Sequence, residues 1–250
     1  MGAVGSVYAV SDVHGYPEDL RAGLREAGLL DGGDRWADQD ADLWVLGDLT
    51  DRGPDGIGVI RLVRDLQEQA PEQVHVLMGN HEALARGYHL FPDSRFAEAW
   101  LINGGLAEDQ AALTKDDLDW LGSLPVLGRA GDYLLMHSDT TGYLEWGTDV
   151  EDVNATVAGM LAGDVDQHWA VFAALTSRYD FAGDDGADAA DKMLGAFGGS
   201  RIVHGHSIIG TLIGRPSHET TVPIQYADGR VIAIDGGRYD GGPLLVVQLD

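Results

Sequence analysis

Short apolar runs alternate with amphipathic segments through the first third of the chain. Val4–Ser11, Leu43–Leu46 and Val74–Met78 are apolar runs of strand length, which predicts three strands. Between them, Pro17–Ala27 and Pro54–Gln69 begin with proline and place apolar residues at helical spacing, which predicts two helices. This β-loop-α order predicts an α/β fold with strands buried between helices.

The remainder of the chain combines helical stretches with short strand-like runs. Ala83–Leu124 is mostly helical in pattern, Asp152–Arg178 predicts a helical pair, and Ala182–Asp191 predicts an acidic loop. We expect the regions 83–124 and 150–200 to form a helical cap on a single domain covering residues 1–250. The runs that predict further strands are Tyr133–Met136, Arg201–Val203, Val231–Ile234 and Leu244–Leu249.

Three polar strings follow the first three predicted strands. They are Asp12-Val13-His14-Gly15, Gly47-Asp48-Leu49-Thr50-Asp51-Arg52-Gly53 and Gly79-Asn80-His81-Glu82. Asp12 and Asp48 are 36 residues apart, and Asp48 and Asn80 are 32 apart, while one βαβ unit needs about 30 or more residues. The strings therefore fall at equivalent ends of successive strands, where open α/β sheets bind their ligands.

Composition excludes several classes of function. The 250 residues contain no cysteine, so disulfides, thiolate nucleophiles and zinc–thiolate sites are excluded. The formal net charge of −25, from 16 basic and 41 acidic residues, argues against binding to nucleic acid or to an anionic membrane. No apolar run reaches membrane-spanning length and the first residues do not follow a signal-peptide pattern, so we expect a cytoplasmic protein.

Together, the three strings resemble the signature of calcineurin-like metallophosphoesterases. The longest string, with Trp100–Gly105 and Ile234–Gly237, points to the phosphoprotein-phosphatase branch. Within that branch, Gly28–Asp31 followed by Trp36 is similar to bacterial Shewanella-like phosphatases. The resemblance implies a sandwich of mixed β-sheets flanked by helices (αββα), with the active site at the C-terminal ends of the strands. It is thin from about residue 147 to residue 200.

The resemblance also implies a pair of divalent metal ions. All their ligands are hard or borderline oxygen and nitrogen donors, so manganese, iron or zinc would suit, and we expect manganese first. Asp48 is the candidate bridge between the two ions. The first ion would be held by Asp12, His14 and Asp48, and the second by Asp48, Asn80, His137 and His206.

A catalytic apparatus follows from the same resemblance. A hydroxide that bridges the two metals would attack the phosphorus atom. His81 would donate a proton to the leaving oxygen, with Asp51 orienting its ring. Arg52 would clamp the phosphate oxygens, Asn80 would contact the substrate, and Arg178 is the candidate for a second phosphate contact.

Two residues near the implied ligands have no settled role in the sequence. His204 lies in the string His204-Gly205-His206, and we align His206 with the family pattern, which makes His204 a structural residue or a partner of a ligand. The family often has a small residue and then glycine after the histidine of the fourth motif, whereas this chain has Ser138 and Asp139. Asp139 adds a carboxylate near the site.

Three functions are compatible with these residues. The first is a metal-dependent phosphomonoesterase whose substrate is a phosphoprotein or a small phosphoester. The second is a symmetrical diadenosine-tetraphosphate hydrolase or a phosphodiesterase, which shares the motifs. The third is a non-catalytic adaptor, which the presence of every implied ligand and of His81 disfavours. The sequence does not indicate an oligomeric state.

Overall fold

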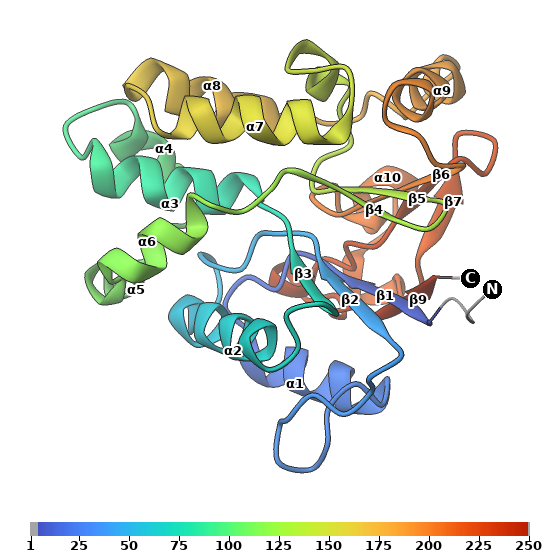
Figure 1. Cartoon of the computed structure of the whole chain (residues 1–250), viewed down its shortest axis with the longest axis horizontal. Coiled ribbons are helices and arrows are strands. Elements are labelled where there is room, and N and C mark those ends of the chain that lie inside the picture. The colour runs from blue at the N-terminus through green and yellow to red at the C-terminus, as the bar shows by residue number, and fades with distance from the viewer. Residues whose placement is uncertain (1–4, 250) are drawn as a thin grey trace.

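Two β-sheets lie at the centre of the computed structural model, which describes residues 5–249 (Figure 1). The first sheet has the strand order β3-β2-β1-β9. Its first three strands in the sequence run parallel, as their loop-helix connections require, and β9 is antiparallel to β1. The bounds are β1 Val7–Val10, β2 Asp42–Val45, β3 Val74–Val76 and β9 Val247–Leu249.

The second sheet is built from the later part of the chain. Its order is β4-β5-β6-β8-β7, with β5, β6 and β8 parallel and with antiparallel strands at both edges. The bounds are β4 Leu127–Ala130, β5 Tyr133–Met136, β6 Arg201–His204, β7 Ile224–Tyr226 and β8 Val231–Ala233.

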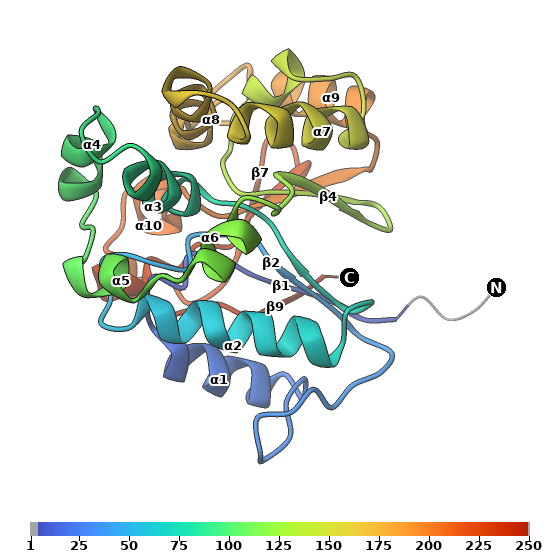
Figure 2. The same ribbon diagram turned by 60° about the vertical axis from the view of Figure 1, so that its left-hand side comes forward.

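Helices cover the outer side of each sheet (Figures 1 and 2). In both views α1 and α2 lie beside the first sheet, α7 to α9 lie beyond the second, and α3 to α6 lie at one end. The bounds are α1 Pro17–Glu26, α2 Gly56–Gln69, α3 Asn80–Leu90, α4 Phe96–Ile102, α5 Ala107–Ala112, α6 Lys115–Leu121, α7 Val150–Leu161, α8 Val165–Thr176, α9 Gly186–Phe197 and α10 Ile209–Ile213; short 3₁₀ helices are η1 Gly142–Glu145, η2 Ser217–Glu219 and η3 Arg238–Asp240.

The alternation of side chains along the strands creates separate cores on the two faces of each sheet. Ala9 and Leu46 from the first sheet region pack with Leu135 and Val203 from the second in one buried cluster between the sheets. Val10, by contrast, packs in the cluster that includes the helices. This layering confirms the expected αββα sandwich. No helix within residues 5–249 is both long and apolar enough to span a membrane.

Most predicted elements are present, with shifted boundaries. The helical pair is confirmed as α7 and α8, and Val4 of the first predicted strand lies outside the described residues. The acidic loop predicted over Ala182–Asp191 is wrong for its second half, because α9 begins at Gly186. Asp188 lies in the first turn of α9, where the helix dipole favours negative charge, so the acidic residues there support a helix.

Candidate metal centre

Every predicted metal ligand follows a strand, and every one is buried. The strands concerned are parallel ones of both sheets, so their C-terminal ends converge on one edge of the sandwich. Asp12 and His14 follow β1, Asp48 follows β2, Asn80 begins α3 after β3, His137 follows β5, and His206 follows β6.

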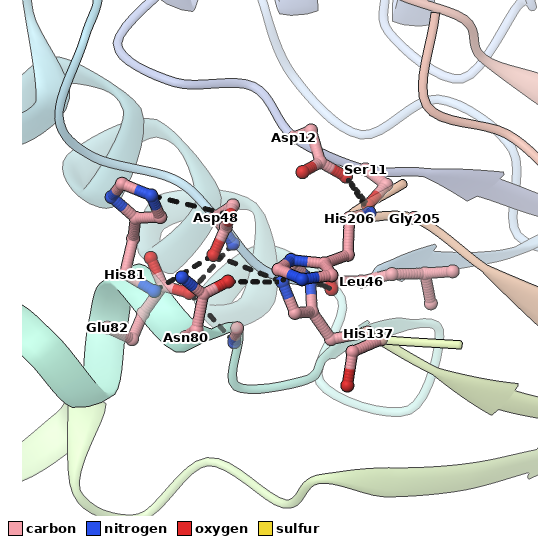
Figure 3. Close-up of polar contacts among 12 residues, drawn as sticks. Ser11, Asp12, Leu46, Asp48, Asn80, His81, Glu82, His137, Gly205 and His206 are labelled. Atoms are coloured by element: carbon pink, nitrogen blue, oxygen red, sulfur yellow. Dashed lines mark hydrogen bonds and ion pairs between the residues drawn. The ribbon is translucent and has the colours of Figure 1, made fainter. Parts of the chain in front are cut away.

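The carboxylate of Asp48 lies at the centre of this group. Figure 3 shows it between His81 on one side and His137 with His206 on the other. Its Oδ2 is 3.6 Å from Nε2 of His14, and its Oδ1 is 3.3 Å from Nε2 of His137. Two sets of donor atoms, each within 4.8 Å of one another, share this residue: His14, Asp48 and His81, and Asp48, His137 and His206. The geometry matches a carboxylate shared by two cations.

Three imidazoles of the centre are oriented by backbone carbonyl groups. Nδ1 of His14 donates to the carbonyl oxygen of Thr50 at 2.9 Å, and Nδ1 of His137 donates to that of Leu46 at 2.8 Å. Nε2 of His206 donates to the carbonyl of Thr176 at 3.1 Å. A carbonyl oxygen only accepts, so the other ring nitrogen of each neutral histidine carries the lone pair that a metal ligand requires, and that of His14 accepts from Nη1 of Arg52 at 2.9 Å.

The remaining two candidate ligands also face this group. Oδ1 of Asp12 is 3.9 Å from Nε2 of His14, while its Oδ2 accepts from the backbone N–H of His206 at 2.8 Å. Oδ1 of Asn80 is 3.0 Å from Nε2 of His137. One oxygen of Asp12 is therefore occupied by the protein and the other is directed toward the imidazoles.

Buried negative charge makes the centre suitable for cations. Burial, together with the carboxylates of Asp12 and Glu82, raises the pKa of Asp48 well above its usual range. Burial and the carboxylate of Asp12 also raise the pKa of Asp235, whose Oδ2 is buried without a hydrogen-bond partner among the described residues. Buried carboxylates are costly unless paired or bound to metals, and divalent cations would supply the missing charge. The donor set fits two such ions.

His81 differs from these histidines because its partner is a carboxylate. Its Nδ1 is 2.7 Å from Oδ2 of Asp51, and its Nε2 is buried with no hydrogen-bond partner among the described residues. Burial raises the pKa of Asp51 to about 7, whereas burial and the charge of Arg52 lower the pKa of His81. When Asp51 is protonated and donates to Nδ1, the neutral ring of His81 carries its own proton at Nε2, which is 3.9 Å from Oδ2 of Asp48.

Of the two predicted phosphate-binding arginines, Arg52 contacts the centre directly, and Arg178 lies two residues after Thr176, whose carbonyl oxygen accepts from His206. The guanidinium of Arg52 places Nη1 2.9 Å from Nε2 of His14 and lies over the ring of Tyr239, 4.1 Å from its centroid. The side chain of Arg178 is exposed. Burial lowers the pKa of both His81 and His137, and the positive charge of Arg178 contributes to both shifts, as expected for a guanidinium close to the centre.

Most residues of this centre lie within a region that matches a known protein family. Residues 5–210 match the sequence model of the family described as calcineurin-like phosphoesterases. The chain belongs to this family. The matched range contains all six predicted metal ligands, and it ends before Asp235 and Tyr239.

Individual proteins similar to this chain share about a third or less of its residues over the aligned regions. The chain is 30% identical over 134 residues to the symmetrical bis(5'-nucleosyl)-tetraphosphatase of Nitrosospira multiformis, covering 53% of this chain and 43% of that protein. The chain thus spans less than half the length of that relative. A cold-active protein-tyrosine phosphatase of a Shewanella species has a similar structure, with a TM-score of 0.75, 21% identity, and coverage of 99% of this chain and 76% of the other. A protein serine/threonine phosphatase from Saccharomyces cerevisiae gives a TM-score of 0.60, 16% identity, and coverages of 94% and 68%. These structural likenesses show the fold.

Glu82 has no predicted role in the sequence, yet it organises two loops of the centre. Its carboxylate accepts from the backbone N–H groups of Asp48 and Leu49, each at 2.8 Å, and of Gly79 at 2.9 Å. It therefore ties the loop after β2 to the start of α3. The only indication of this role in the sequence is its place at the end of the string Gly79-Asn80-His81-Glu82.

The sequence gives no indication that Asp235 and Tyr239 lie near the centre, apart from the short glycine-rich string that contains Asp235. They reach the centre from the C-terminal segment only because β8 lies beside β6 in the second sheet.

His204 has partners on both ring nitrogens: Nδ1 donates to the carbonyl of Gly205 and Nε2 contacts the hydroxyl of Tyr226, both at 2.7 Å. Neither nitrogen of His204 is left free for a metal.

The backbone at the centre is unusual in a way that no side-chain pattern reveals. Positive φ angles are uncommon for residues other than glycine and are typical of strained functional sites. Close packing accompanies them: a Cβ at Gly79 would lie 2.3 Å from Oδ1 of Asp48, so only glycine fits there. The non-glycine residues with positive φ include Asp12 (53°), His14 (44°), Asp48 (55°), Asp51 (66°), Arg52 (66°) and His206 (62°).

Proposed function

We propose that this protein is a dinuclear, divalent-metal-dependent phosphatase that hydrolyses phosphomonoesters. The observation that carries the proposal is the buried Asp48 carboxylate shared by two His/Asp groups, with His81 beside it. Asp12, His14 and Asp48 would hold one ion, and Asp48, Asn80, His137 and His206 the other. When bound, the two ions would supply a nucleophile by lowering the pKa of water. We propose manganese as the metal, with iron and zinc as alternatives.

The residues of the chain have separate tasks in this proposal. Arg52 and Arg178 bind the phosphate oxygens and orient the ester, and the amide of Asn80 contacts the same group. His81 delivers the proton held with Asp51 from Nε2 to the leaving oxygen. The separate role of His81 is supported by its hydrogen-bond partner. Its Nδ1 contacts the carboxyl group of Asp51, whereas the three histidines assigned to metal bind backbone carbonyl oxygens.

We propose a phosphoprotein or a small phosphoester as the substrate. Support comes from the two protein phosphatases with similar structures, whose names show that this fold can act on phosphoproteins. We also propose that the chain acts as one domain with α3–α6 and α7–α9 as a cap. The cytoplasmic location stays a prediction from the sequence.

The test is phosphate release from p-nitrophenyl phosphate by the manganese-loaded protein. We expect release that a chelator abolishes and that the Arg52→Ala variant largely lacks. A phosphotyrosine peptide and a phosphoserine peptide then distinguish between protein substrates. Two bound metals without release from any monoester would contradict the proposal.

A symmetrical dinucleotide-tetraphosphate hydrolase is the second candidate. The name of the Nitrosospira multiformis relative, 30% identical over 134 residues, favours it. Diadenosine tetraphosphate given to the same preparation would then yield ADP as the only nucleotide product. A kcat/KM for this substrate far above that for every monoester would replace the first proposal by the second.

A further inference from the structure

Two loops beside the metal centre are joined by a reciprocal pair of carboxylates. Oδ2 of Asp139, which follows β5, accepts from the backbone N–H of Tyr179 at 2.9 Å. Oδ2 of Asp180, which follows α8, accepts from the backbone N–H of Thr141 at 2.7 Å. Each loop therefore donates to the carboxylate of the other, and the two loops are held in one relative position.

Asp139 also contacts the third loop of the centre. Its Oδ1 accepts from the hydroxyl of Ser207 at 2.5 Å, and its carbonyl oxygen accepts from the N–H of Asp180 at 3.0 Å. The side chain of Asp139 is fully buried. One buried residue thus connects the segments that carry His137, Arg178 and His206.

The backbone that Asp139 holds has an unfavourable conformation. Tyr179 has a φ of 73°, in the left-handed region that an aromatic residue seldom adopts. Such a conformation persists only where neighbouring contacts enforce it. The bond from Asp139 is made to the N–H of this residue, and so fixes the peptide group that joins Tyr179 to Arg178.

That peptide group forms the C-terminal side of the Arg178 backbone, from which the guanidinium extends. Arg178 is exposed two residues after the end of α8, and its guanidinium lies 5.9 Å from the centroid of the Tyr179 ring. A flexible, exposed arginine loses much conformational freedom when it binds an anion. A fixed backbone reduces that loss, because fewer orientations of the side chain remain to be restricted.

We propose that Asp139 is a positioning residue that holds Arg178 toward the phosphate group of the substrate. The inference rests on the proposed phosphatase function. It assigns a role to the residue at which the chain departs from the glycine expected after the fourth motif. Asp139 acts through Arg178 and makes no contact with the substrate itself.

The test is a double-mutant cycle on the full-length, manganese-loaded protein. The variants are Asp139→Ala, Arg178→Ala and the two combined, and the primary measurement is the Kd for inorganic phosphate by titration calorimetry. We expect each single variant to weaken phosphate binding about ten- to hundredfold, as for loss of a charge-assisted hydrogen bond. The double variant should bind no more weakly than Arg178→Ala alone, because Asp139 has no effect without the arginine.

Two further variants separate positioning from general destabilisation. Asp139→Asn keeps an oxygen that can accept from Tyr179, so it should recover phosphate affinity to within about threefold of the wild type. Asp117→Ala is the matched control, because Asp117 is a buried carboxylate that accepts from the backbone N–H of Thr114 at 3.0 Å in α6. It should lower Tm and leave the phosphate Kd unchanged.

The outcomes decide between the inference and the proposed function. Multiplicative effects in the double variant, or an Asp139→Ala variant with lower Tm and unchanged phosphate affinity, would overturn the positioning role. Failure of the wild-type protein to bind phosphate would overturn it as well. If the cycle behaves as expected while no monoester is hydrolysed, the positioning role stands and the monoesterase proposal fails.

Discussion

His81 and His14 are both buried beside Asp48, yet their Nδ1 atoms have different partners. Nδ1 of His14 donates to a carbonyl oxygen, whereas Nδ1 of His81 lies against the carboxylate of Asp51. Burial lowers the pKa of both imidazoles and so favours their neutral forms. A carbonyl oxygen only accepts, so Nδ1 of His14 carries the ring proton, whereas a protonated Asp51 can donate to Nδ1 of His81 and leave the ring proton on Nε2. The same donor geometry also groups His81 with His14 and Asp48 around one potential ion. As a proton donor His81 could be removed without loss of metal, whereas as a metal ligand its removal would cost an ion.

We expect His81→Ala to lower kcat by about 10²- to 10⁴-fold, which is the usual contribution of general acid catalysis. The variant should still bind two metal ions per chain, as measured by metal analysis after gel filtration. His137→Ala is the matched control, and it should lose one ion. Loss of one ion from His81→Ala would instead make His81 a ligand.

Asp51 gives a second prediction, on stability. Its pKa is raised by burial from 3.8 to about 7, so the folded protein binds a proton that the unfolded chain releases between these values. Its contribution to folding is therefore full below pH 3.8 and is lost as the pH rises through about 7. Asp51→Asn keeps the shape without the charge. In chelator-treated protein, this variant should gain stability over the wild type by about 2–4 kcal/mol between pH 4 and pH 7, at about 1.4 kcal/mol per pKa unit.

Urea denaturation at several pH values measures this difference. Asp55→Asn is a suitable control, since Asp55 is exposed and caps α2 through the N–H of Gly58. The difference in unfolding free energy between Asp55→Asn and the wild type should stay constant over the same pH range. A constant difference for Asp51→Asn would mean that Asp51 is ionised in the folded protein.

Helix α3 begins at the metal centre, so its first turn links secondary structure to metal binding. Asn80 and His81 are its first two residues, and Glu82 ties the turn to the loop after β2. We expect Glu82→Ala to weaken manganese binding about 10- to 100-fold, as for other groups that orient ligands. It should also destabilise the protein by about 2–4 kcal/mol, because buried N–H groups lose a charged acceptor.

Metal titration and urea denaturation provide the two readouts for Glu82→Ala. Asp149→Ala is the control among helix starts, because Asp149 caps α7 by accepting from the N–H of Asp152 at 2.8 Å. Loss of that cap should cost about 1 kcal/mol and leave manganese affinity unchanged. Equal metal affinity in wild type and Glu82→Ala would show that Asp48 is positioned without Glu82.

The elements also explain what the sequence could and could not predict. The strands before Asp12, Asp48 and Asn80 were predictable because each apolar run ends directly at its polar string. β4 was missed because Gly128 and Arg129 interrupt its apolar pattern. The contact of Asp139 with Tyr179 joins residues 40 positions apart, and no local pattern encodes it. Local periodicity thus predicted the frame, while tertiary packing determined its supporting contacts.

The molecule as a whole places its ligands on both sheets. Asp48 follows β2 of the first sheet and His137 follows β5 of the second, so a bound pair of ions would join the two halves of the sandwich. Ligands that bind only the folded state stabilise it by mass action, by about 2.7 kcal/mol at a hundredfold excess over Kd. For a chain of this size, chelation should therefore lower Tm by about 5–10 °C.

Scanning calorimetry with manganese, and then with excess chelator, tests this expectation. The double variant Asp48→Asn/His137→Ala should show no manganese-dependent shift in Tm. An equal shift in this variant would place the stabilising ions elsewhere on this acidic chain, whose formal net charge is −25.

The division of ligands between the sheets has a use outside enzymology. A cut after the exposed Ser123 would leave Asp48 on one piece and His137 on the other, so neither piece could assemble both sites. The two pieces would still recognise each other, because β9 from the second piece pairs with β1 of the first. Reassembly of the pieces would then respond to manganese, and the protein could serve as a two-part reporter of free metal.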